Sequence, residues 1–194
     1  MSVVIHEVSH GYAASFLGDQ TARYQGRLTL NPFKHLDPVG SFIVPAVAYF
    51  FGGFIIGWAK PVPYNPYNLK PSRWSEAIVA GAGPASNILI ALVFGLLLRF
   101  SLLTEFAFAG PAFIQITSII VSINIILAIF NLVPIPPLDG SKILFALFPE
   151  KFLEIRIFFE KFGFLLILFF IFFLWRLVFP LVVWIFALIT GVAF

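Results

Sequence analysis

The alternation of apolar and polar stretches along the chain predicts a helical protein that crosses a membrane several times. Apolar runs cover residues 2–17, 41–59, 76–99, 112–133 and 162–179, and more polar stretches separate most of them. In a helix, about 20 apolar residues are needed to cross a bilayer core of roughly 30 Å. The run lengths predict an all-α polytopic membrane protein with about 4–6 membrane segments.

The first run, residues 2–17, is too short to cross a bilayer and ends at Gly18-Asp19, which is a helix-stop signal. We favour the interpretation that the upstream half of this helix is missing. Residues 1–194 would then form a single membrane-embedded domain with a truncated N-terminus. The alternative is a genuinely short helix.

Two features are expected between the runs 2–17 and 76–99. The stretch from Thr21 to Leu30 is short and partly alternating, which predicts a strand pair at the membrane surface. The run 41–59 is interrupted by Pro45 and Gly52-Gly53, and each of its flanks carries three Lys or Arg residues. A simple crossing would place one basic flank outside the cell, so we expect a re-entrant hairpin that returns to the side it left.

The C-terminal third is expected to begin with an amphipathic helix at the membrane interface, over residues 141–161. The run 162–179 then predicts another crossing, and Arg176 with Pro180 is expected to break or kink it. The final apolar stretch, 181–194, is either the second half of a hairpin or a bent extension.

The composition supports a membrane protein and limits its chemistry. Hydrophobic residues make up 60% of the chain and charged residues 11%, against about half and one-quarter in a typical soluble domain. The absence of cysteine excludes disulfides and thiolate metal sites. The 12 Lys and Arg residues are scattered, which indicates topology signals and no nucleic-acid partner. The sequence carries no signal for the oligomeric state.

The strongest chemical signal is the sequence His6-Glu7-Val8-Ser9-His10. Positions i and i+4 lie on one face of a helix, so the two imidazoles can bind one zinc ion. Glu7 then lies close enough to act as general base on a water at the metal. The alternative is a histidine pair whose ring nitrogens are satisfied by packing partners.

A catalytic zinc usually has three protein ligands, so a third is required. Asp139 is the best candidate, because it lies between two apolar stretches, where a carboxylate is costly unless a metal or charged group compensates it. The alternative is a turn aspartate in an Asp-Gly pair. His35 is expected at the surface, and Asp19 in an exposed turn.

A common site for these residues requires a particular topology. The helices 2–17 and 112–133 must run parallel, with 76–99 antiparallel between them. The loops on the site's side, 18–40, 60–75 and 134–161, carry ten of the twelve Lys and Arg residues. Because positive loops face the cytoplasm, the site is expected toward the cytoplasmic side.

Small and amide residues supply the candidates for substrate contact. The run Gly-Ala-Gly-Pro-Ala-Ser-Asn opens the helix 76–99, and in it Gly83 and Asn87 are the substrate-binding candidates. Asn87 and Asn131 carry amides suited to a peptide or a developing oxyanion. The alternative is helix packing, with Asn87 as an interhelical hydrogen-bonding group.

The segments HEVSH, GAGPASN and NLVPIPPLDG, in this order on successive apolar runs, resemble the site-2 protease family of intramembrane zinc metallopeptidases. NPFKHLDPVG followed by GWAKPVPYNP is similar to its short bacterial and archaeal branch, and the resemblance covers roughly residues 2–190. It implies His6, His10 and Asp139 as zinc ligands, Glu7 as the catalytic acid and base, and Asn131 near the scissile carbonyl. It also implies substrates that are transmembrane segments of other proteins. The chain departs from the family by carrying little helix before HEVSH.

The sequence therefore predicts a zinc-dependent intramembrane endopeptidase in a prokaryotic cell membrane. Two other classes remain as alternatives: a metal-binding relative that does not cut, and a small transporter or channel for a metal ion. A transporter places ionisable groups along a path through the membrane, whereas here they gather toward one face.

Overall fold

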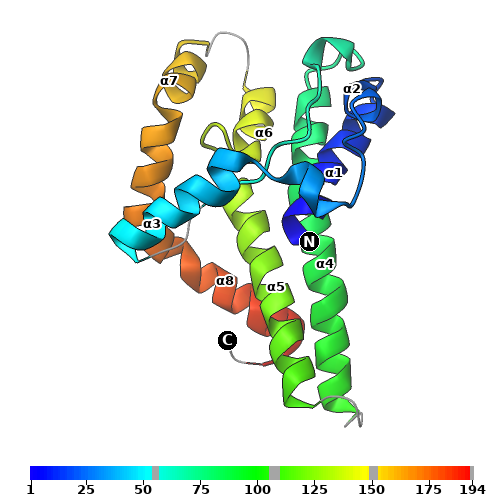
Figure 1. The fold of residues 1–194 in the computed structure, drawn as a ribbon, viewed down its shortest axis with the longest axis vertical. Helices are drawn as coiled ribbons and strands as arrows, with labels where there is room; N and C mark the ends of the chain where they lie inside the picture. Colours follow the sequence, from blue (N-terminus) through cyan, green and yellow to red (C-terminus); the bar gives the residue numbers. More distant parts are fainter. Residues whose placement is uncertain (54–56, 105–109, 149–152, 193–194) are drawn as a thin grey trace.

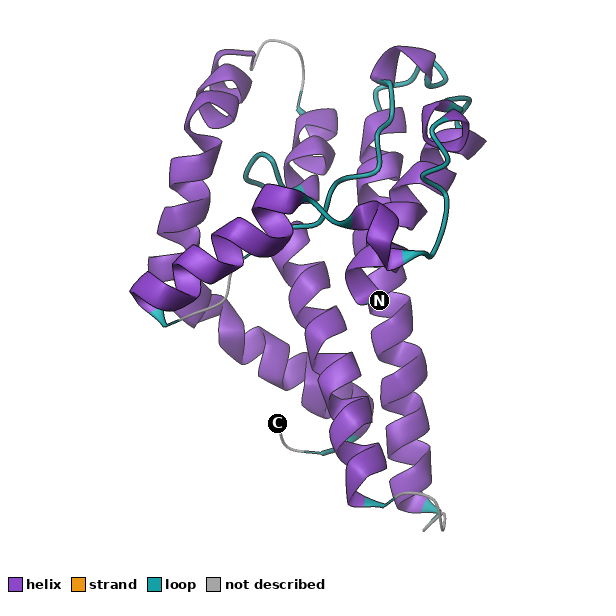
Figure 2. Ribbon diagram, viewed as in Figure 1, coloured by secondary structure: helices purple, strands orange, loops and turns teal. Residues whose placement is uncertain are grey.

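The structure, a computed structural model, describes residues 1–53, 57–104, 110–148 and 153–192, and these residues contain helices but no strand (Figures 1 and 2). The α-helices are α1 (Ser2–Phe16), α2 (Thr21–Tyr24), α3 (Val44–Gly52), α4 (Ser75–Leu103), α5 (Pro111–Asn131), α6 (Asp139–Leu147), α7 (Leu153–Phe169) and α8 (Trp175–Thr190). Short 3-10 turns cover Pro32–His35 and Pro66–Asn68, and π-helical turns cover Val39–Ile43 and Phe170–Leu174.

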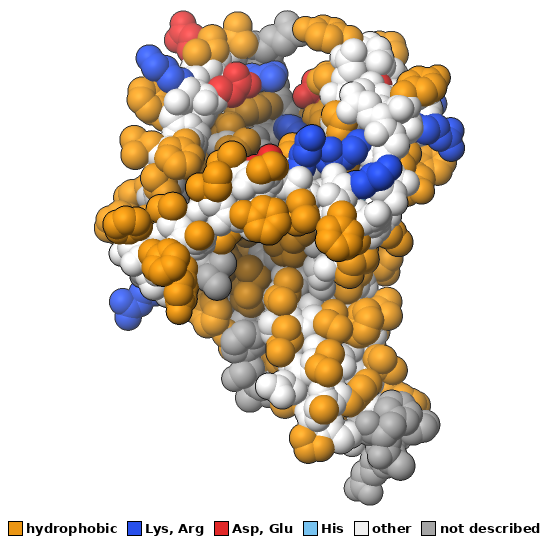
Figure 3. Space-filling view, in the orientation of Figure 1, with side chains coloured by type: hydrophobic (Ala, Val, Ile, Leu, Met, Phe, Trp, Pro, Cys, Tyr) orange, Lys and Arg blue, Asp and Glu red, His pale blue; other side chains and the backbone are white. Residues whose placement is uncertain are grey.

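Within the described ranges, three helices are long and apolar enough to cross a membrane: α4, α5 and the continuous stretch Leu153–Thr190. The predicted all-α polytopic membrane protein is therefore confirmed. Figure 3 shows that most charged side chains on the visible face gather at the end of the molecule that carries the longer loops, whereas the opposite end is apolar.

The predicted topology is also confirmed. In Figure 1, α1 and α5 run in the same direction and α4 runs in the opposite direction. Helix α4 packs against both of them and also contacts α6 and α8. This central position lets α4 support side chains that come from both ends of the chain.

Close packing at the far end fixes α8 against the pair of long helices. A buried apolar cluster joins α4, α5 and α8 through Ala91, Val121, Ile125, Val182 and Phe186. Gly95 permits this contact, because a Cβ atom there would collide with the Ile189 side chain. In lipid such tight packing, rather than hydrophobic burial, holds helices together.

The strand pair predicted over Thr21 to Leu30 is wrong. Residues Thr21–Tyr24 form α2, and the chain then turns at Gly26, whose φ is +61°. The Asp19 carboxylate accepts hydrogen bonds from the backbone N–H of Thr21 at 3.2 Å and its hydroxyl at 2.6 Å. Local side-chain bonds of this kind start a helical turn and compete with strand pairing.

Two polar residues expected at the surface are buried. Asp19 is 1% exposed and also accepts hydrogen bonds from the Asn65 N–H at 2.8 Å and the Asn68 amide at 2.9 Å. Burial alone raises the pKa of the Asp19 carboxyl, but these hydrogen bonds with those from Thr21 outweigh it, and the pKa is lowered. His35 is also 1% exposed, with its Nε2 2.9 Å from the Thr29 carbonyl oxygen.

The two ends of the segment 41–59, which is expected to be a re-entrant hairpin, lie side by side. The Trp58 N–H donates to the Gly40 carbonyl at 3.1 Å, and the Ser41 hydroxyl donates to the Trp58 carbonyl at 3.1 Å. Gly40 has no room for a side chain beside the Trp58 indole. Residues 54–56 lie outside the described part of the chain. The entry of this segment into lipid stays a prediction.

The C-terminal third differs from its expected boundaries. The predicted helix over 141–161 is divided, because α6 ends at Leu147 and α7 begins at Leu153. Figure 1 shows α7 and α8 at an angle, and between them lies the π-helical turn Phe170–Leu174. Such a turn interrupts the regular hydrogen-bond ladder and allows a bend. The bend therefore lies before Arg176 and Pro180, the residues at which it was predicted, and α8 continues through both residues. The described part of the final stretch is an extension of the helix that follows the bend.

The topology gives the first testable prediction. Because the chain contains no cysteine, single cysteines introduced by Gln25→Cys, Lys70→Cys and Leu103→Cys report the sidedness of three exposed positions. We expect positions 25 and 70 to be labelled by a membrane-impermeant maleimide from one side of the membrane and position 103 from the other. Labelling of 25 and 70 from opposite sides would contradict the topology.

Candidate metal centre

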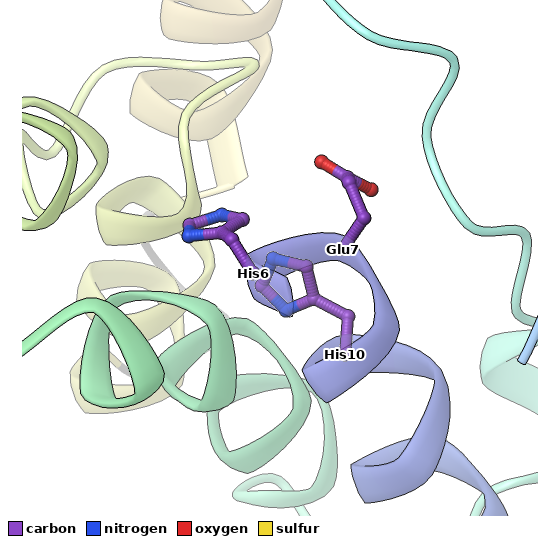
Figure 4. Close-up of side chains that lie close together, drawn as sticks. All are labelled: His6, Glu7 and His10. Atoms are coloured by element: carbon purple, nitrogen blue, oxygen red, sulfur yellow. The ribbon is translucent and has the colours of Figure 1, made fainter. Parts of the chain in front are cut away.

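Two imidazoles of α1 lie side by side, as their spacing predicts. The rings of His6 and His10 are buried, their centroids are 4.7 Å apart, and their planes make an angle of 87°. Figure 4 shows both rings and the Glu7 side chain on the same part of α1. One ligand atom from each of these three residues lies within 4.8 Å of the others.

Asp139 reaches this pair from the other end of the chain. Helix α5 ends at Asn131, a proline-rich turn follows, and Asp139 is the first residue of α6. Gly140 lets the chain turn this closely, because a Cβ atom there would overlap the Leu132 carbonyl. The Asp139 Oδ2 atom lies 3.1 Å from His6 Nε2 and 3.2 Å from His10 Nε2.

The hydrogen bond made by Nδ1 of each imidazole determines that Nε2 faces Asp139. His10 Nδ1 lies 2.7 Å from the Val79 carbonyl oxygen, which only accepts, so Nδ1 carries the proton. His6 Nδ1 lies 2.6 Å from the Asn87 side-chain oxygen and donates to it. In the neutral tautomers both Nε2 atoms therefore present lone pairs toward Asp139 Oδ2.

This donor set fits a metal ion. Three lone-pair atoms at close range repel one another unless a cation or extra protons lie between them. Tetrahedral zinc with ligands at 2.0–2.1 Å separates its ligand atoms by about 3.3 Å, close to the observed 3.1 Å and 3.2 Å. Nitrogen and carboxylate oxygen are ligand types that zinc takes.

A second polar layer holds His6 in place. The Asn87 amide donates to the Asn124 side-chain oxygen at 2.8 Å, and the Asn124 amide donates to the Ser2 hydroxyl at 2.9 Å. Asn87 and Asn124 are fully buried. The sequence analysis missed Asn124, although an amide inside an apolar crossing is a signal for an interhelical hydrogen bond.

Gly83 brings α4 against the imidazoles. A Cβ atom at this position would lie 2.5 Å from His10 Nε2 and 2.6 Å from His6 Cε1. No side chain fits between α4 and the two rings, which explains the need for glycine at this point. Contact of Gly83 or Asn87 with a substrate stays a prediction.

Glu7 lies beside the centre and is held by a residue that the sequence analysis did not single out. The Val62 N–H donates to Glu7 Oε2 at 2.9 Å. One carboxylate oxygen is therefore oriented by the backbone of the polar loop 60–75, and Glu7 itself is half-buried. A carboxylate in this position is placed to exchange a proton with a water at the centre.

The described hydrogen bonds do not join Asn131 to the cluster. Its amide donates to the Leu127 carbonyl of its own helix at 2.9 Å. It lies at the last position of α5, just before the turn that leads to Asp139. A role near the substrate stays a prediction.

A membrane-spanning helical fold that brings two imidazoles and two carboxylates together defines a membrane protein with a metallopeptidase-type centre. The chain belongs to peptidase family M50, the site-2 protease family, whose sequence model matches residues 1–174. The resemblance predicted from the motifs is thus confirmed, and the chain is a zinc metallopeptidase. A transporter or channel is not supported.

The relatives differ in length from this chain. YwhC of Bacillus subtilis, named as a candidate zinc metalloprotease, is 39% identical over 171 residues, covering 87% of this chain and 75% of YwhC. Rip2 of Mycolicibacterium smegmatis is 34% identical over 147 residues, covering 72% and 51%. MJ0611 of Methanocaldococcus jannaschii is 32% identical over 144 residues, covering 73% and 63%. Rip2 and MJ0611 are, like YwhC, named as candidate zinc metalloproteases. No solved structure gives a significant match.

The second layer gives the next prediction. Replacing Asn87 by Ala removes the acceptor for His6 Nδ1–H, so the ring loses its fixed tautomer and orientation. Loss of such a partner weakens metal binding by about ten-fold or more, measurable by zinc competition against a chromogenic chelator. Ser122→Ala, which removes a hydroxyl bonded within α5, is the matched control. Unchanged zinc affinity in a folded Asn87→Ala protein would contradict the role of this layer.

Proposed function

We propose that this chain is a zinc-dependent intramembrane endopeptidase that hydrolyses peptide bonds in or near transmembrane segments of other membrane proteins. The observation that carries the proposal is the meeting of His6, His10 and Asp139 at hydrogen-bonding distance, with Glu7 beside them. This arrangement suits hydrolysis by an activated water without a covalent intermediate.

Each residue of the centre has a distinct proposed role. His6 and His10 bind zinc through Nε2, and Asp139 binds it through its carboxylate. Zinc, when bound, polarises the scissile carbonyl and lowers the pKa of water at the site. Glu7 accepts a proton from the attacking water and later returns it to the leaving amine.

The depth of the centre supports cleavage within the membrane. Val79 and Asn87, which hold the two imidazoles, belong to the spanning helix Ser75–Leu103. At 1.5 Å per residue they lie about 6 and 18 Å along the axis from Ser75. A substrate helix must unwind there, because its carbonyls are otherwise hydrogen-bonded. We propose Asn131, Gly83 and Asn87 as groups near the unwound peptide.

The proposed location is a prokaryotic cell membrane, with the centre opening toward the cytoplasm. The loops on the side of the centre carry most of the Lys and Arg residues, and such loops remain in the cytoplasm. The relatives in Bacillus subtilis, Mycolicibacterium smegmatis and Methanocaldococcus jannaschii support a prokaryotic setting.

The test of this function separates metal binding from catalysis. Glu7→Gln removes the proton acceptor and leaves His6, His10 and Asp139 intact, so we expect unchanged zinc content and a rate lowered at least about 100-fold. The purified protein is reconstituted with a panel of single-span membrane peptides, and products are identified by mass spectrometry.

Glu154→Gln, an exposed position on α7, is the matched control and should cut like the parent protein. Cleavage retained in Glu7→Gln would refute the role of Glu7. A parent protein that binds zinc and cuts no member of the panel would favour a relative that binds metal without cutting.

A further inference from the structure

A cavity lies at the loop-bearing end of the molecule, and its lining residues differ from those of the metal centre. Its volume is about 350 Å³, and the described residues that line it come from the start of α4 and the chain just before it, from α6 and its C-terminal end, and from the start of α7. Figure 1 shows α6 between α7 and α4 at this end. The lining residues are Ser72, Arg73, Glu76, Lys142, Phe145, Ala146, Phe148 and Arg156.

The charge of this cavity is positive. Among the described residues that line it, Arg73, Lys142 and Arg156 are accompanied by one carboxylate, that of Glu76. Within the described ranges, Arg156 is the only one of the three cations with a carboxylate within ion-pair distance, and that partner is the half-exposed Glu160. The excess positive charge disfavours a metal ion and favours an anion.

Aromatic rings contact two of the cations, and Arg156 also donates through Nε to the Glu160 carboxylate at 2.8 Å. The Lys142 ammonium lies 5.1 Å from the centroid of the Tyr64 ring, and the Arg156 guanidinium lies 5.4 Å from that of Phe145. A cation–π contact orients a charged group without using its N–H donors, so the Lys142 ammonium and the terminal guanidinium nitrogens of Arg156 can donate to an anion. Arginine donors match phosphate oxygens in pairs, and lysine adds a point charge.

The depth of the cavity matches the lipid head groups. Ser72 and Arg73 directly precede the spanning helix that begins at Ser75, so they lie where the apolar core of the membrane ends. Phe145 and Phe148 add an apolar wall. The cavity is small, which suits one head group and excludes a nucleic acid.

From these observations we propose that this cavity binds a phosphate group at the membrane surface through Arg73, Lys142 and Arg156. The phosphate belongs to the head group of an anionic phospholipid or to free phosphate in the cytoplasm. The proposal is independent of peptide cleavage, since none of these residues belongs to the metal centre.

The experiment measures the thermal stability of the full purified chain in a neutral detergent. The additives are dioctanoyl-phosphatidylglycerol, dioctanoyl-phosphatidylcholine and inorganic phosphate, each in a concentration series. We expect phosphatidylglycerol to raise the Tm and phosphatidylcholine to leave it unchanged. A rise of the same size with inorganic phosphate at equal concentration would identify soluble phosphate as the source; a rise with the lipid alone would identify the head group.

The variants assign the effect to the cavity. In the double variant Lys142→Gln with Arg156→Gln, the half-saturating concentration of the active additive should increase about ten- to thirty-fold, since each basic residue near the surface contributes roughly 1 kcal/mol. Arg23→Gln with Lys34→Gln removes the same charge from exposed positions outside the cavity and should respond like the parent protein.

Arg73→Gln provides a second test should the double variant fail to fold, because it leaves the Lys142 and Arg156 contacts intact. It should raise the half-saturating concentration by a smaller factor. The proposal is overturned if neither phosphatidylglycerol nor inorganic phosphate stabilises the parent protein, or if the cavity variants respond no differently from the control.

Discussion

His6 and His10 on α1 and Asp139 on α6 bring two imidazole lone pairs to within 3.2 Å of one carboxylate oxygen in a buried place. Without a cation or extra protons this meeting is unfavourable, so the packing around it must be rigid enough to maintain it. The Val79 carbonyl and the Asn87 amide bind the outer nitrogens of the rings, so neither ring can turn away without breaking a buried hydrogen bond.

Helix α4 meets this requirement because of its small residues. Gly83 allows it to approach the imidazoles, and Gly95 allows α8 to pack against its other end. Since Asn87 also joins α4 to Asn124 of α5, one helix connects the metal centre with the membrane-spanning core. The same helix begins beside the basic cavity, which places both sites on one structural support.

Local rules made the central part of this arrangement predictable. The spacing of His6 and His10 follows from helix geometry, and Asp139 stands out because a carboxylate between apolar runs is costly. The requirement that these residues meet in one site gave the relative directions of the helices. What escaped prediction depends on distant contacts: α2 is started by the Asp19 carboxylate, whose other partners, Asn65 and Asn68, come from a later loop. The backbone N–H of Val62 that orients Glu7 likewise leaves no mark in the sequence near the motif.

Zinc content is the most direct test of the central claim. We would purify the chain in detergent and measure zinc per molecule by elemental mass spectrometry, for the parent protein, His6→Ala and Asp139→Ala. The account predicts about one zinc per chain in the parent protein and little in either variant, because a site with three protein ligands loses most of its zinc affinity when one of them is removed. A folded parent protein without zinc, or an Asp139→Ala protein that retains it fully, would contradict the account.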